Sequence, residues 1–94
     1  MAQLVRWQLI FHGTVQNVGF RYEMTRLARH YGLSGWVMNH RDGSVEAHVQ
    51  GTETNIRLML EELTTIDHIH VTEVVKTPLP LCASEQHFVT RFDD

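Results

Sequence analysis

The order of hydrophobic periods along the chain is the strongest constraint on its fold. Every second residue of the segment 4–12 is apolar, which predicts a strand with one buried face. That face carries Val5, Trp7, Leu9 and Phe11. From Phe20 onward the apolar residues follow a helical spacing, and Gly32 supplies a residue that can end the helix in a left-handed conformation. The helical stripe consists of Phe20, Met24, Leu27, Ala28 and Tyr31.

The middle of the chain predicts a hairpin and a second helix. Residues 35–39 and 45–50 are short strands, and the Asp42-Gly43 pair between them is typical of a hairpin turn. Thr52 is a suitable N-cap for the helix that follows. The apolar stripe of this helix is narrow and consists of Ile56, Met59, Leu60 and Leu63.

Two further strands are expected in the last third of the chain. The first spans residues 68–76 and presents Ile69, Val71 and Val75 on one side. Residues 77–85 contain two prolines and are therefore expected to form a loop. A short strand over residues 86–92 follows.

The expected order of elements is strand, helix, strand, strand, helix and strand, with a short strand at the end. This is the order of a split βαβ or ferredoxin-like α+β sandwich. Because each helix is apolar on one face only, both are expected to pack on one face of an antiparallel sheet. No linker or internal repeat interrupts the pattern, so residues 1–94 are expected to form one domain. This fold hosts many activities, and the function has to be argued from a site.

Composition excludes several functions. The chain has 8 Lys and Arg residues against 11 Asp and Glu residues, and this net charge of −3 disfavours binding to nucleic acid. No apolar run reaches the roughly 20 residues of a membrane-spanning helix. Cys82 is the only cysteine, so an internal disulfide is excluded. The first residues lack the pattern of a secretory signal, and we expect a cytoplasmic monomer without nucleic-acid or membrane partners.

A loop bounded by Gly13 and Gly19 leads directly into the first helix, whose opening turn holds Arg21. Glycine and asparagine allow left-handed backbone, so several N–H groups of such a loop can converge on one anion. The helix start adds unpaired amides and the positive end of a dipole. Arg21 opposes that dipole unless an anion binds there. The alternative is an ordinary strand-to-helix turn with an arginine in solvent, and this segment alone does not distinguish it from an anion site.

Asn39 closes the strand over residues 35–39, where its side chain can project beyond the sheet. A neutral carboxamide offers one acceptor and two donors, which suits it to hold a water molecule in one orientation. The alternative is a turn asparagine that bonds its own backbone.

Together, the two segments resemble the signatures of the acylphosphatase family. Residues 13–21 read GTVQNVGFR and resemble the family's loop, G-x-V-Q-G-V-x-F-R. Residues 35–39 read GWVMN and, with Gly43, Val45 and Gly51, are similar to the second signature. The expected element order is also similar to that of the family over essentially the whole chain. The resemblance implies an enzyme that hydrolyses acyl phosphates, which are mixed carboxylic–phosphoric anhydrides, without a metal or other cofactor.

The resemblance also implies roles for individual residues. Arg21 corresponds to the arginine that binds phosphate, and Asn39 to the asparagine that orients the attacking water. The backbone amides of the loop would cradle the phosphate, and they belong to Thr14, Val15, Gln16, Asn17, Val18, Gly19 and Phe20. Asn17 departs from the family's glycine, and Phe11 stands where the family usually has an aliphatic residue.

Two other interpretations remain. His68 and His70 would share a strand face and could hold a metal ion, but no third ligand is evident, so we expect no metal site. A non-catalytic anion-binding or regulatory module of the same fold would keep Arg21 and the loop without turnover.

Overall fold

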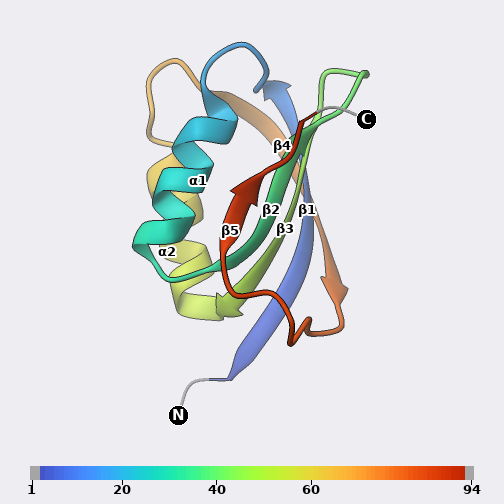
Figure 1. The fold of residues 1–94 in the computed structure, drawn as a ribbon. Coiled ribbons are helices and arrows are strands. Elements are labelled where there is room, and N and C mark those ends of the chain that lie inside the picture. Colours follow the sequence, from blue (N-terminus) through green and yellow to red (C-terminus); the bar gives the residue numbers. More distant parts are fainter. Residues whose placement is uncertain (1–2, 93–94) are drawn as a thin grey trace.

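A single sheet with the strand order β4-β1-β3-β2-β5 forms one layer, and two helices form the other. The computed structural model describes residues 3–92. Figure 1 shows both helices on the same face of the sheet. The elements are β1 (Leu4–Thr14), α1 (Phe20–His30), β2 (Ser34–Asn39), β3 (Val45–Thr52), α2 (Glu53–Leu63), β4 (His70–Leu79) and β5 (Phe88–Thr90).

The ferredoxin-like α+β fold is confirmed, but the sheet is mixed and not wholly antiparallel. β1 pairs antiparallel with β3 and β4, and β2 pairs antiparallel with β3. β5 pairs parallel with β2. Because β4 runs opposite to β2, one return of the chain across the end of the sheet makes β5 run in the same direction as β2.

The fourth strand differs from its prediction in two ways. It begins at His70 and continues through Pro78 to Leu79, where a loop was expected. An edge strand tolerates proline where the missing N–H would face solvent, and β4 pairs only with β1. Val75 is 43% exposed and not buried, because the register between β1 and β4 shifts at His12 and Gly13. This irregularity reverses the alternation of side chains along β4.

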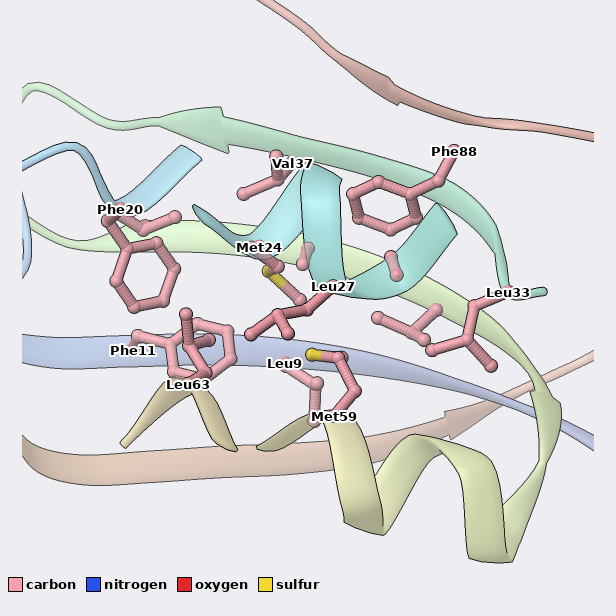
Figure 2. Close-up of a cluster of buried hydrophobic side chains, with 14 of the residues drawn as sticks. Leu9, Phe11, Phe20, Met24, Leu27, Leu33, Val37, Met59, Leu63 and Phe88 are labelled. Atoms are coloured by element: carbon pink, nitrogen blue, oxygen red, sulfur yellow. The ribbon is translucent and has the colours of Figure 1, made fainter. Parts of the chain in front are cut away.

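Hydrophobic side chains from both layers form the core between the helices and the sheet (Figure 2). The fully buried large side chains include Leu9, Phe11, Phe20, Met24, Met59, Leu63 and Phe88. Thr52 caps α2 as expected, since its Oγ1 accepts a hydrogen bond of 3.2 Å from the N–H of Asn55. In the described part of the chain, no helix is long and apolar enough to span a membrane.

Candidate active site

The loop between β1 and α1 adopts the backbone conformation that its sequence predicts. Thr14 still belongs to β1, so the connection is shorter than expected. Asn17 and Gly19 are both left-handed, with φ of 62° and 76°. Gly19 is the N-cap of α1, and no side chain of the described residues caps this helix. The first amides of α1 therefore face the end of the molecule without a side-chain acceptor.

Asn39 lies at the end of β2 and pairs with Val45 of β3. This position directs its side chain to the helix-covered side of the sheet. Its Oδ1 is buried, and none of the residues 3–92 donates a hydrogen bond to it. A buried acceptor without a partner costs about 1–3 kcal/mol, so the local structure bears a cost at this side chain that a purely structural asparagine would avoid.

Arg21 lies in the first turn of α1 and is held by the segment after β5. Its Nη1 donates a hydrogen bond of 3.1 Å to the carbonyl oxygen of Arg91. The guanidinium carbon also lies 5.7 Å from the centroid of the Phe92 ring. These two contacts fix the side chain beside the start of the helix.

One cavity of about 430 Å³ brings the two predicted side chains together. Of the nine predicted site residues, six line it: Val15, Asn17, Gly19, Phe20, Arg21 and Asn39. Thr14, Gln16 and Val18 are not among the lining residues. The cavity therefore combines a guanidinium, a carboxamide residue and the start of a helix, which together suit an oxyanion and a water molecule.

The sequence model of the family described as Acylphosphatase matches residues 7–93. The chain belongs to this family. The prediction of an acyl phosphate hydrolase, made from the two signatures, is confirmed by this membership.

Relatives and solved structures agree with this membership. An acylphosphatase of Bifidobacterium longum is 47% identical over 62 residues, which is 66% of this chain and 64% of the relative. An acylphosphatase of Nitrobacter winogradskyi is 36% identical over 94 residues, and the match covers 94% of this chain and 94% of the relative. The crystal structure of acylphosphatase from Bacillus subtilis superposes with a TM-score of 0.84 at 30% identity, covering 95% of this chain and 99% of that one.

The side chain of Gln16 links the acylphosphatase loop to the turn that follows Asn39. Its Nε2 donates hydrogen bonds to the carbonyl oxygens of His40 and Ser44, at 2.5 and 2.8 Å. Inside the turn, hydrogen bonds from the Ser44 hydroxyl and N–H hold the pKa of Asp42 below its usual value. Gln16 thus connects the loop that lines the cavity with the strand end that carries Asn39.

A carboxylate on the open face of the sheet ties the same hairpin to β1. Glu46 lies 2.6 Å from His40 Nε2 and 3.1 Å from His48 Nε2, and it accepts a hydrogen bond of 2.8 Å from Gln8. Burial alone raises the pKa of Glu46, but the hydrogen bonds from His40, Gln8 and His48 outweigh it and lower that pKa.

The cavity is also lined by three residues that the sequence did not indicate, namely Tyr22, Thr90 and Phe92. Two of them belong to β5 and the residues after it, which reach the site because β5 runs parallel to β2. The hydroxyl oxygens of Thr25 and Thr90 lie 2.8 Å apart and join α1 to β5. A parallel pairing of distant segments has no local sequence signal, so the pattern along the chain could not find these residues.

The two histidines considered as metal ligands do not share a strand face. His68 precedes β4, whereas His70 is its first residue, and both are exposed. Within residues 3–92, no group of three or more His, Cys, Asp or Glu side chains could hold a metal ion. The expectation of a site without metal stays a prediction.

Proposed function

We propose that this acylphosphatase hydrolyses its substrate without a metal ion, with Arg21 and the loop amides binding the phosphoryl group and Asn39 orienting the attacking water. The observation that carries the proposal is that Arg21 and Asn39, which come from two different elements, line one cavity at the start of α1. In this proposal the Asn39 carboxamide holds the attacking water by a hydrogen bond, in a fixed orientation beside the phosphate site.

A phosphoryl group bound beside Gly19 would place its negative charge at the positive end of the helix dipole of α1. A guanidinium near a helix N-terminus opposes the dipole by a few tenths of a kcal/mol, roughly, and a bound phosphate reverses this effect. Arg21 can offer the phosphoryl oxygens a two-pronged contact while the Arg91 carbonyl holds one of its nitrogens. The amides of residues 14–20 complete the cradle in this proposal.

The chemistry needs little beyond positioning and charge stabilisation. The water oxygen forms a bond to phosphorus while the bond between phosphorus and the acyl oxygen breaks, and the carboxylate leaves with the electron pair of that bond. The water proton passes to a phosphoryl oxygen. Because a carboxylate is a good leaving group, orientation of the water and neutralisation of the phosphoryl charge can supply most of the acceleration.

Asn17 replaces the family's glycine without changing the left-handed backbone of this position. Asparagine is among the residues that tolerate such a conformation best. Its side chain lines the cavity, so it either offers the phosphoryl group one more donor or narrows the cradle.

Hydrolysis of acetyl phosphate tests the proposal. We expect Arg21→Ala and Asn39→Ala each to lower kcat/KM about a hundredfold or more, and EDTA to leave the wild-type rate unchanged. Arg57→Ala, at an exposed position of α2, is the matched control for loss of one arginine. Phosphate binding without turnover in the wild type would instead favour the non-catalytic anion-binding module. Loss of activity in EDTA would contradict the metal-free mechanism.

The expectation of a cytoplasmic monomer that acts on a small acyl phosphate stays part of this proposal. Size-exclusion chromatography with light scattering tests the oligomeric state, and a stable dimer at assay concentrations would contradict it.

A further inference from the structure

A second cavity of about 700 Å³ continues from the candidate active site along the groove between α1 and β5. The two cavities share three lining residues, Tyr22, Thr90 and Phe92. The shared residues make the second cavity a continuation of the first. Together the two spaces are far larger than a phosphoryl group with a two-carbon acyl group requires.

Arginines line this second cavity, and none of its lining residues in the described chain is acidic. The two arginines differ in their partners. Arg26 is paired with Glu23, whose Oε1 accepts hydrogen bonds of 3.0 and 2.7 Å from Nε and Nη2. Arg29 uses its Nε to donate a hydrogen bond of 3.1 Å to the carbonyl oxygen of Phe88. No residue of the described chain accepts from its two terminal nitrogens, so these form a fork that can bind a carboxylate.

Apolar surface lines the groove between Arg21 at one end and Arg29 at the other. Tyr22 and Phe92 are 70% and 81% exposed, and Val89 of β5 is also exposed. Arg29 follows Arg21 by eight positions, which is about 12 Å along a helix axis. An acyl phosphate bound at Arg21 can therefore extend its carbon chain along this apolar surface towards Arg29.

We propose that this groove binds the acyl part of the substrate and that Arg29 binds a carboxylate at the far end of that chain. The enzyme then prefers acyl phosphates derived from longer dicarboxylic acids over those with an uncharged chain of equal length. This inference rests on the proposed function, because it takes the phosphoryl group to bind at Arg21.

Adipoyl phosphate and hexanoyl phosphate are the matched probes, since they have the same number of carbons and differ in the terminal carboxylate. We expect the wild type to show a kcat/KM for adipoyl phosphate that is about tenfold or more above that for hexanoyl phosphate. Arg29→Gln is expected to bring this ratio close to one. Arg57→Gln is the matched control and keeps the wild-type ratio, because Arg57 lies at an exposed position of α2 and lines neither of these two cavities.

The outcomes separate this inference from the proposed function. Equal rates for the two probes in the wild type would overturn the subsite while leaving acyl phosphate hydrolysis intact. A preference that survives in Arg29→Gln would remove the role of Arg29. No hydrolysis of acetyl, hexanoyl or adipoyl phosphate would overturn the proposed function itself. The wild-type comparison needs no variant, so it decides even if Arg29→Gln folds poorly.

Discussion

Replacement of Gln16 by alanine removes the side-chain link between the loop at the cavity and the turn after Asn39. The variant loses two hydrogen bonds, to the carbonyl oxygens of His40 and Ser44. Neither carbonyl is left without a donor, because His40 O still accepts from the N–H of Gly43 and Ser44 O from the N–H of His40. The loss is therefore the net value of the two bonds without an added desolvation penalty, about 1–2 kcal/mol in the free energy of unfolding. For a domain of this size that corresponds to a decrease in Tm of roughly 5–15 °C.

Activity is expected to fall more than this loss of stability alone would cause. The loop and Asn39 line the same cavity from two different elements, and Gln16 is a direct link between them. We expect kcat of Gln16→Ala for acetyl phosphate to fall about tenfold at a temperature where the variant remains folded, because a small misplacement of reacting groups is costly. Urea denaturation followed by tryptophan fluorescence gives the stability, and phosphate release gives kcat.

Gln8→Ala is the matched control for this experiment. Gln8 also donates one hydrogen bond to the hairpin, to Glu46 at 2.8 Å, but it lies within β1 and not in the loop between β1 and α1 that contributes to the cavity. It should lose up to about 1 kcal/mol of stability and keep its kcat. A Gln16→Ala variant with wild-type kcat and Tm would refute the linking role, and equal losses of kcat in both variants would show that the effect is not specific to the site.

Three further predictions follow from the described contacts. Asn17→Gly should keep or raise kcat/KM for acetyl phosphate, and its stability should change by about 1 kcal/mol or less, because the backbone there is left-handed; a large loss of turnover would assign a part in the mechanism to the side chain. Phe11→Ala should lower the free energy of unfolding by about 3–5 kcal/mol in urea titrations, since its side chain is fully buried; a loss under about 1 kcal/mol would contradict its place in the core. The pKa of Glu46 is lowered in the folded state, because its hydrogen bonds outweigh the opposing effect of burial. The stability that ionised Glu46 contributes is present above the pKa of the unfolded state, about 4.3, and is lost as the pH falls through the pKa of the folded state. Glu46→Gln should therefore lose less stability than the wild type between roughly pH 5 and 3. An equal loss in both proteins, measured by urea denaturation over this pH range, would refute this.

Local patterns predicted those parts of the fold that depend on neighbours in the sequence. The stripe from Phe20 gave the position of α1, and Thr52 caps α2 as its residue type predicts. The prediction failed where the pairing with a neighbouring strand determines which face of the sheet a side chain occupies. Val75 was expected in the core because alternation continues from Val71, but the register shift against β1 places it on the other face. Such a shift depends on which residues of β1 stand opposite, and no window along β4 contains that information.

The same distinction applies to the site. Arg21 and Asn39 could be found because each lies within a compact motif, and the cavity that joins them follows from the ends of β1 and β2 lying at the same end of the sheet (Figure 1). Thr90 and Phe92 could not be found in this way. They reach the cavity through the parallel pairing of β5 with β2, which depends on the path of the whole chain after β4.

The hydrophobic core packs against both ends of the loop between β1 and α1, and this orders the backbone on which the proposed phosphate site depends. Phe11 lies just before the loop and Phe20 just after it, and their ring centroids are 4.9 Å apart in the core. Val15, within the loop, is also buried. The backbone that would cradle the phosphate is therefore fixed by hydrophobic packing before any ligand binds, so binding does not have to order it. The contact between Phe11 and Phe20 also fixes the backbone at the start of α1, where Arg21 follows Phe20 directly.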